Sequence, residues 1–395
     1  MTNPKIRFKQ ENCIDFPEWN QLQLNECCNC YDNMRKPIKE NLRQKGEYPY
    51  YGANGIQDYI DSYIFDGEFI LLAEDGGNFN DFQSKAIAKY ARGKFWVNNH
   101  AHIIQAKREF SNKFIFYSIE HKDIRSYING STRGKLTKSD MWNIKIGVPS
   151  SIREQQKIAS FFTTLDQKIE LNERKLEVLE KLKKGMMQKI FNRKIRFKKD
   201  NGTDFPDWTV SELGNIAEIR GGGTPSTSNR DYWDGNIQWL TPTEIDSKYV
   251  HESNRKITES GLANSSAKLL PMGAILLTTR ATIGACSINN FNGSVCTNQG
   301  FQSLVCKTSV LNEYVYYAIT FDEFQKKIAK HASGSTFLEI SAKNLKKLTI
   351  PTPSLEEQRK IADFLSTLDL QIDIKKKTVS AIRDLKRGFM QQMFV

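Results

Sequence analysis

The chain has 395 residues, 39% of them hydrophobic and 26% charged, and a formal net charge of +12. A chain of this length is too long to fold around one ordinary hydrophobic core, which indicates two or more domains. Because no run of about 18 apolar residues occurs and the first residues lack an apolar stretch, the sequence predicts neither a membrane span nor a secretion signal, and we expect a cytoplasmic protein. The excess of Lys and Arg favours a polyanionic partner, although a merely basic surface would have the same composition.

The two halves of the sequence begin and end alike. The motif KIRFK occupies residues 5–9 and returns at 194–198, and EQQKIA at 154–159 returns as EQRKIA at 357–362. Between these matched ends the halves are dissimilar, apart from one shared Gly-Ser-Thr. The repeat predicts a variable domain, a constant helical region, a second variable domain and a second constant region, at residues 1–150, 151–192, 193–350 and 351–395.

The two variable segments have the patterns of mixed α/β domains. Runs rich in β-branched and aromatic residues predict strands, and apolar residues at helical spacing predict helices. The first segment shows strands at 68–73 and 94–97 and a helix at 112–120, and the second shows strands at 274–278 and 301–305 and a helix at 311–324.

The constant segments have the apolar repeat of a coiled coil. Alternating steps of four and three residues from Ile158 and from Ile361 meet apolar side chains at eight of ten positions, with polar residues at the same two places in both copies. We expect two helices of about 57 Å, capped by Ser150 and Ser354, that pack antiparallel about a pseudo-twofold axis. The alternative is that each helix covers only its own domain. The expected interface residues are Ile158, Phe162, Leu165, Ile169, Leu176, Leu179, Ile361, Leu365, Leu368, Ile372, Val379 and Ile382.

Loops that combine glycine with hydroxyl, amide and basic side chains interrupt both variable segments. Glycine allows close approach to phosphate, and Asn, Gln and Arg can make bidentate hydrogen bonds to base edges. An ordinary surface turn explains any one such loop, but their joint occurrence in a basic, duplicated chain favours DNA binding.

Signatures of catalysis and of metal binding are missing from the sequence. It contains no Asp-Pro-Pro-Tyr-like methylation motif, no methyl-donor loop and no Walker loop. Neither the cluster of Cys27, Cys28 and Cys30 nor the pair His100 and His102 has further ligands at a suitable spacing, so we expect no metal site.

The sequence resembles the specificity subunits of type I restriction-modification systems along essentially its whole length. The motifs that carry the resemblance are YYGANG at 50–55, FWVNNHAH at 95–102, GGTPS at 222–226, LTTRATIG at 277–284, TNQGF at 297–301 and PSLEEQ at 353–358. The resemblance implies two target recognition domains joined by two helical regions that form an antiparallel coiled coil.

The resemblance also implies the function of such a chain. Each domain would read one half of a bipartite site in double-stranded DNA, and the helices would set the spacer and dock two modification subunits. S-adenosylmethionine and the methylation chemistry would belong to those subunits, and ATP, Mg²⁺ and cleavage to restriction subunits, leaving this chain non-catalytic and without a cofactor. The competing hypotheses are a self-contained DNA methyltransferase and a coiled-coil scaffold.

By position along the chain, the resemblance places DNA-facing residues in both domains. The first domain departs from the second in having LAEDGG at 72–77 where the second has LTTR at 277–280, so we expect unrelated half-sites. The implied residues are Tyr51, Asn54, Asn98, Asn99, His100, Ser131, Thr132, Arg133 and Lys135 in the first domain, and Gly223, Thr224, Thr279, Arg280, Thr282, Asn298, Gln299, Ser335 and Thr336 in the second.

Overall fold

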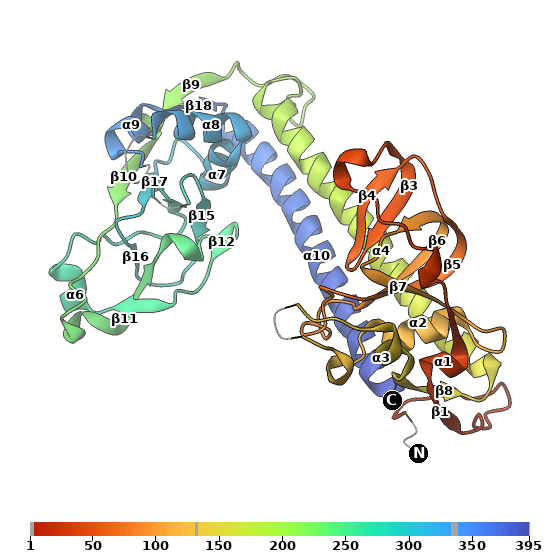
Figure 1. Ribbon diagram of the computed structural model, residues 1–395. Coiled ribbons are helices and arrows are strands. Elements are labelled where there is room, and N and C mark those ends of the chain that lie inside the picture. Colours follow the sequence, from red (N-terminus) through yellow and green to blue (C-terminus); the bar gives the residue numbers. More distant parts are fainter. Residues whose placement is uncertain (1–3, 131–132, 281, 333–338, 395) are drawn as a thin grey trace. The chain divides into compact units, whose positions relative to one another are not determined.

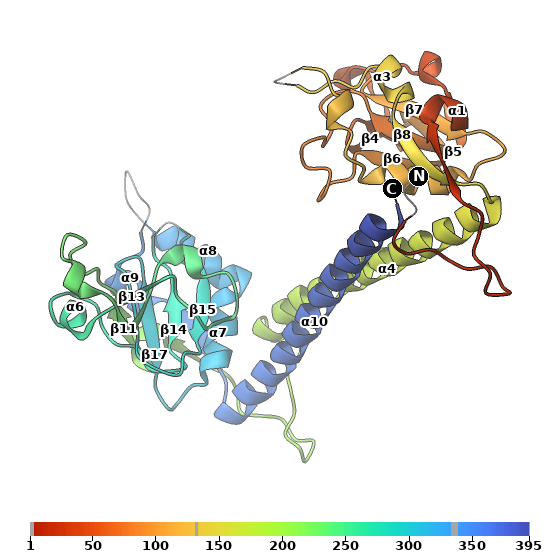
Figure 2. The ribbon, with the colours of Figure 1, turned by 90° about the horizontal axis from the view of Figure 1, so that it is seen from below.

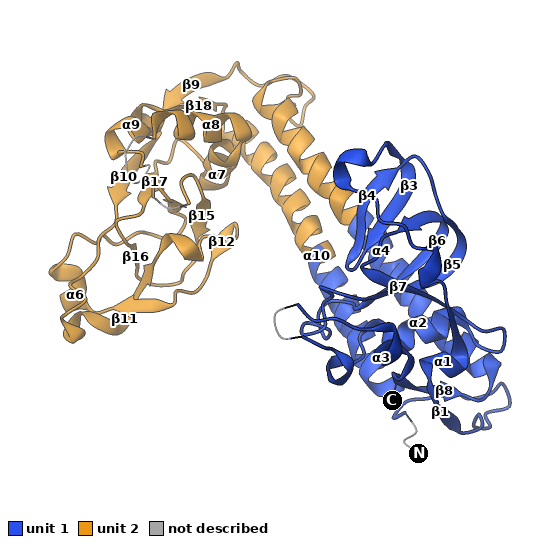
Figure 3. Ribbon diagram, in the orientation of Figure 1, with its two compact units in different colours: residues 1–174, 376–395 blue, residues 175–375 orange. Residues whose placement is uncertain are grey.

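The computed structural model describes residues 4–130, 133–280, 282–332 and 339–394, and the chain divides into two compact units. Unit 1 comprises residues 1–174 and 376–395, and unit 2 comprises residues 175–375 (Figure 3). Each unit therefore combines one α/β domain with parts of both long helices. None of the helices within the described ranges has the length and apolar character that a membrane span requires.

The α/β domain of unit 1 is built on a six-stranded sheet with the strand order β2-β7-β5-β6-β3-β4, beside a two-stranded sheet of β1 and β8 (Figure 1). Residues 69–73 of the central strand β5 are all buried, because the sheet is covered on both faces there. Its strands and α-helices are β1 (Trp19–Gln23), α1 (Leu24–Cys27), β2 (Cys28–Cys30), β3 (Lys45–Gly52), β4 (Gly55–Ile60), β5 (Phe65–Ala73), β6 (Ala88–Val97), β7 (Ala101–Ala106), α2 (Asn112–Glu120), α3 (Lys138–Trp142) and β8 (Lys145–Pro149).

The α/β domain of unit 2 has smaller sheets. Its five-stranded sheet has the order β10-β17-β14-β15-β12, its three-stranded sheet the order β13-β11-β16, and β18 pairs with β9. Its elements are β9 (Thr209–Glu212), α5 (Leu213–Ile216), β10 (Ala217–Gly221), β11 (Trp233–Leu240), β12 (Tyr249–Val250), β13 (Arg255–Ile257), α6 (Glu259–Ala263), β14 (Ile275–Leu277), β15 (Cys286–Asn289), β16 (Val295–Thr297), β17 (Gln302–Cys306), α7 (Asn312–Thr320), α8 (Asp322–His331), α9 (Ala342–Lys347) and β18 (Thr349–Thr352).

Two long helices, α4 (Ile152–Phe191) and α10 (Leu355–Met393), contribute to both units. Within unit 1 they run antiparallel and lie side by side in both views (Figures 1 and 2), since Phe161 contacts Phe389 at 5.0 Å between ring centroids and Asp166 contacts Lys386. The expected architecture of two mixed α/β domains and two paired long helices is confirmed.

The predicted interface residues lie on the inner faces of these helices. Each domain core takes side chains from both helices, so the alternative in which a helix covers only its own domain is wrong. Buried positions are Ile158, Phe162, Leu165, Ile361, Leu365, Leu368, Ile372 and Val379, and half-buried positions are Ile169, Leu176, Leu179 and Ile382.

The repeated motifs at the ends of each half meet in a buried ion pair. Glu154, fully buried at the start of α4, accepts hydrogen bonds from Arg7 Nη2 at 2.8 Å and from Trp19 Nε1 at 3.3 Å. A buried carboxylate needs such partners, so the motif residues are tied to one another across the chain. The second copy repeats the set with Glu357, Arg196 and Trp208.

One polar residue of the apolar seam in each helix, Lys386 in α10 and Lys183 in α4, forms an ion pair as well. Lys386 Nζ lies 2.7 Å from Asp166 Oδ1 and 2.9 Å from Glu120 Oε2, above the ring of Tyr117. Burial opposes the charged form, but the two carboxylates hold the pKa of Lys386 above its ordinary value. In the other copy Lys183 pairs with one carboxylate, that of Asp369, and lies above the ring of Tyr317.

Two local predictions are wrong. The helix expected at 311–324 is divided into α7 and α8, because Phe321 between them has extended backbone angles. The cap prediction holds for Ser354, whose hydroxyl accepts from the Glu357 amide at 3.4 Å. It fails for Ser150, because α4 begins at Ile152 and the cap position is Ser151; the Ser150 hydroxyl instead donates to the carbonyl of Glu18, the residue before β1, at 2.7 Å.

Candidate nucleic-acid interface

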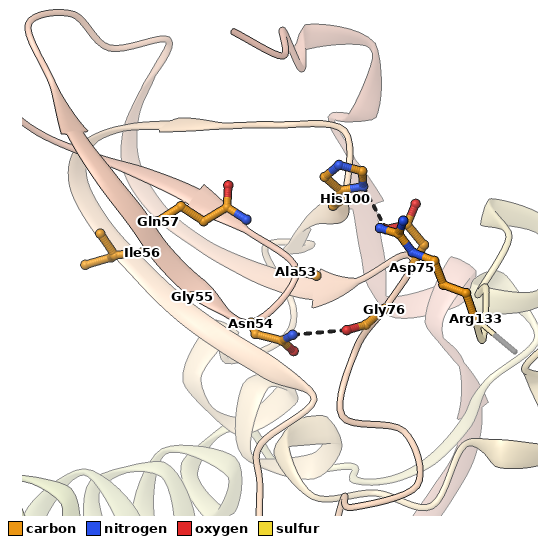
Figure 4. Close-up of a pocket in the computed structure, with 9 residues that line it drawn as sticks. All are labelled: Ala53, Asn54, Gly55, Ile56, Gln57, Asp75, Gly76, His100 and Arg133. Carbon is orange, nitrogen blue, oxygen red and sulfur yellow. Dashed lines mark hydrogen bonds and ion pairs between the residues drawn. The ribbon is translucent and has the colours of Figure 1, made fainter. Parts of the chain in front are cut away.

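Four loops of unit 1 converge on one pocket of about 310 Å³, and one of them, after β5, contributes Asp75 and Gly76. Asn54 comes from the turn between β3 and β4, His100 from the turn between β6 and β7, and Arg133 from the segment before α3. All three were predicted as DNA-facing residues, and the structure brings them together (Figure 4). The remaining lining residues are Ala53, Gly55, Ile56, Gln57, Asp75 and Gly76.

Asp75 joins two of these loops. Its Oδ1 accepts from His100 Nδ1 at 2.7 Å and from Arg133 Nη2 at 2.9 Å (Figure 4). Asn54 Nδ2 donates to the carbonyl of Gly76, the next residue, at 3.0 Å. The carboxylate therefore fixes a cationic side chain and an imidazole at the rim of the pocket.

Two predicted residues of unit 1 support the loops from inside. Asn98 is buried, and its Oδ1 accepts from the His100 amide at 2.8 Å, which closes an Asx turn. The Tyr51 ring is half-buried and packs edge-on against Phe95. The Asn98 side chain therefore points inward, whereas Tyr51 keeps part of its surface exposed.

The other predicted residues of unit 1 differ in accessibility. Asn99 is exposed, and Lys135 Nζ lies 3.6 Å from Glu74 Oε1 with about half of its side chain exposed. Ser131 and Thr132 lie outside the described residues.

Asp32, Glu74 and His102 form a cluster whose ligand atoms could hold a metal ion. Arg35 occupies the space between the carboxylates, 2.5 Å from Glu74 and 3.4 Å from Asp32. His102 Nδ1 lies 2.6 Å from Asp32 Oδ2. Burial acts to raise the pKa of Asp32, but His102, the Ile103 amide and Arg35 together hold that pKa below its ordinary value. These contacts describe an ion-pair network that braces the strand ends beneath the pocket loops.

The exposed polar residues of unit 2 lie on corresponding loops. Gln299 is exposed and accepts a hydrogen bond from the Thr224 hydroxyl. Arg280, which follows β14, contacts Glu339 Oε2 with its Nε at 2.9 Å. Thr282 is exposed. These side chains can reach a ligand in solution.

Other predicted residues of unit 2 have structural contacts. Thr279 is fully buried and its hydroxyl donates to the Gly300 carbonyl at 3.3 Å. Gly223 is buried, and a Cβ there would lie 2.2 Å from the Ala267 nitrogen, so only glycine fits this close approach. Ser335 and Thr336 lie outside the described residues.

The two domains share one Asx turn, closed by Asn98 in unit 1 and by Asn298 in unit 2, which we call the turn frame. Asn298 Oδ1 accepts from the Gly300 amide at 2.8 Å, the same bond and distance as Asn98 with the His100 amide in unit 1. The frame is thus built twice, with different side chains on it.

Sequence reasoning missed Asp75 and Glu339 as members of these surfaces. Both are carboxylates, which are not expected next to phosphates. The signal was the departure between LAEDGG and LTTR, which places an acidic residue in one copy where the other has a basic one.

Comparison with known proteins gives consistent matches along the chain. Residues 17–181 and 206–383 match the type I restriction modification DNA specificity domain family. A Haemophilus influenzae protein assigned as a type I restriction enzyme specificity subunit is 32% identical over 370 residues, covering 91% of this chain and 90% of the relative. The MjaIX specificity subunit of Methanocaldococcus jannaschii is 38% identical over 195 residues, covering 48% of this chain and less than half, 44%, of that subunit.

A solved structure has the same fold. The S subunit of a type I restriction-modification system from M. genitalium superposes with a TM-score of 0.67 and 16% identity, covering 100% of this chain and 99% of the other. The family match, which includes both α/β domains, and the full-length relative lead to the same conclusion: the chain belongs to the family of type I restriction-modification specificity subunits.

Proposed function

We propose that this chain recognises a bipartite sequence in double-stranded DNA, with the α/β domain of each unit reading one half-site. The observation that carries the proposal is the turn frame of Asn98 and Asn298, which is built twice but bears different exposed side chains. Two domains that share this turn but carry different exposed side chains suit a DNA site whose two halves have unrelated sequences.

The proposed contact surface of each domain consists of its accessible loop side chains. Amide and guanidinium groups suit base edges, whereas Lys135 suits phosphate. Buried Asn98 and Thr279 would position loops rather than touch DNA. The proposed contacts are Asn54, Asn99, His100, Arg133 and Lys135 in unit 1, and Thr224, Arg280, Thr282 and Gln299 in unit 2.

We propose that the two long helices set the spacer between the half-sites and dock two modification subunits. Deleting one heptad from each helix, residues 176–182 and 379–385, would leave the end pairs of Lys386 with Asp166 and of Lys183 with Asp369 in register. Seven residues correspond to about 10 Å of helix, or about three base pairs. We expect a shorter spacer in the preferred sequence, and an assembled complex with an unchanged spacer would contradict this role.

The chemistry is proposed to belong to the partners of this chain. Modification subunits would supply S-adenosylmethionine and methylation, and restriction subunits would supply ATP- and Mg²⁺-dependent cleavage. Calorimetry of the isolated chain with S-adenosylmethionine should show no binding heat, and stoichiometric binding would favour a self-contained methyltransferase instead.

The recognition itself is tested by selection. The chain assembled with its modification subunits is incubated with a library of randomised duplexes at raised salt, where counterion-driven nonspecific binding is weak, and the bound duplexes are sequenced. We expect two informative blocks separated by an uninformative spacer. Bound duplexes without any sequence preference would favour the scaffold hypothesis.

A further inference from the structure

The loop at the end of β5 in unit 1 carries a partly exposed ion pair. The Glu74 amide donates to the His100 carbonyl at 2.9 Å, and the next residue is Asp75. Asp75 accepts from Arg133 at 2.9 Å. The carboxylate here belongs to the strand end, and the guanidinium belongs to the loop before α3.

The loop at the end of β14 in unit 2 has the same backbone path. The Thr279 amide donates to the Gly300 carbonyl at 2.7 Å, and the next residue is Arg280. Arg280 contacts Glu339 at 2.9 Å. Arg280 therefore occupies the position of Asp75, but with the opposite charge.

The partner residues also come from equivalent segments. Arg133 lies four residues before Thr137, whose hydroxyl caps α3, and Glu339 lies two residues before Ser341, whose hydroxyl caps α9. The ion pair is thus present in both domains, while its acidic and basic members have exchanged sides. Equivalent loops of the two domains therefore hold one arrangement, a guanidinium beside a carboxylate at the strand end.

The arginine is the outer member of the pair in both domains. The side chain of Arg133 is 64% exposed against 22% for Asp75, and that of Arg280 is 46% exposed against 30% for Glu339. Such surface pairs contribute little to stability. A carboxylate beneath an exposed guanidinium does restrict its orientation, and a planar fork that is held in place needs less ordering to make two parallel hydrogen bonds.

We infer that Arg133 and Arg280 each read a guanine in their own half-site through hydrogen bonds to O6 and N7 in the major groove, with Asp75 and Glu339 as positioning residues. The inference rests on the proposed function, since it assumes that both domains read DNA. The base read in each half-site would be guanine, and the reading side chain an arginine. The guanidinium comes from the loop before α3 in unit 1 but from the loop after β14 in unit 2.

The test uses the duplex-library selection with the full chain and its modification subunits. Arg133→Lys keeps the charge but removes the bidentate fork, and Arg280→Lys does the same in unit 2. We expect each variant to lose about 5- to 150-fold of the discrimination for guanine at one position of one half-site. The other half-site is an internal control for folding and assembly. Arg125→Lys is the matched control, because Arg125 is 57% exposed and pairs with Asp123 elsewhere in unit 1.

The outcomes separate the inference from the proposed function. Loss of guanine preference in only the matching half-site supports the inference. Unchanged preference, or uniformly weaker binding to all sequences, overturns it, because the arginine would then be a surface ion pair or a phosphate contact. If the chain without any substitution showed no sequence preference, the proposed function itself would be refuted.

The positioning residues are tested by coupling. Asp75→Asn should reduce the guanine discrimination of the first half-site, but should add nothing when Arg133 is already Lys. Glu339→Gln should behave in the same way with Arg280→Lys. Additive losses in both double variants would show that the carboxylates act independently of the arginines and would overturn their positioning role.

Discussion

Replacing the buried seam lysine of unit 1 should be more damaging than replacing its counterpart in unit 2. Lys386→Met keeps the apolar stem but leaves the carboxylates of Glu120 and Asp166 without their cation, and the Glu120 side chain is only 11% exposed. Removing one partner of a buried ion pair costs about 3–5 kcal/mol. Lys183→Met releases one carboxylate, that of Asp369, which is about a quarter exposed, so we expect about 1–3 kcal/mol.

The measurement is urea unfolding, with hydrogen exchange followed by mass spectrometry to assign the loss to a unit, because two units need not unfold together. Lys181→Met is the control, since the Lys181 side chain is 73% exposed and pairs with Glu177 at the surface; it should change stability by less than about 1 kcal/mol. A Lys386→Met variant as stable as the control, or less affected than Lys183→Met, would refute the reasoning.

Three further predictions concern other buried groups. Glu154→Ala and Glu357→Ala should each destabilise their own unit by about 3–5 kcal/mol in urea unfolding, because each leaves a buried tryptophan N–H and an arginine without their carboxylate partner. Changes under about 1 kcal/mol would contradict this. Since the pKa of Asp32 is depressed in the folded chain, the contribution of Asp32 to the free energy of unfolding is complete above about pH 3.9 and is lost as the pH falls through the folded-state pKa. In acid unfolding experiments, the stability of Asp32→Asn should therefore depend less on pH in this range than that of the unsubstituted chain. Iodoacetamide at pH 8 should label exposed Cys13 well before Cys296, whose pKa burial raises to about 12, and equal labelling rates by mass spectrometry would exclude this burial.

The repeated and periodic parts of the fold were predictable from the sequence. Helix α2 was expected at 112–120 and occupies Asn112–Glu120, because apolar residues at helical spacing are a local signal; in the structure Ser111 caps it. The break between α7 and α8 was not predictable in this way. Phe321 stacks on Phe191 of α4 at 5.1 Å between ring centroids. Residues 311–331 contain no glycine or proline that would have predicted a break at Phe321.

The candidate site was predictable as loops but not as contacts. Asn54 and His100 were identified from family motifs and Arg133 from a glycine-containing loop, and the structure gathers them in one pocket. Asp75 and Glu339 were missed, because their arginines are 58 (75 to 133) and 59 (280 to 339) positions away and only the folded chain makes them neighbours. Burial of a polar side chain such as Thr279 also depends on packing that a loop motif does not reveal.

The central claim, that two dissimilar domains read the two halves of a split DNA site, is tested most directly by long-read methylation mapping of a host that carries this chain with its modification subunits. The account predicts one methylated motif made of two unrelated specific blocks separated by a fixed stretch of unspecified bases. A contiguous methylated motif, or methylation without sequence preference, would contradict it.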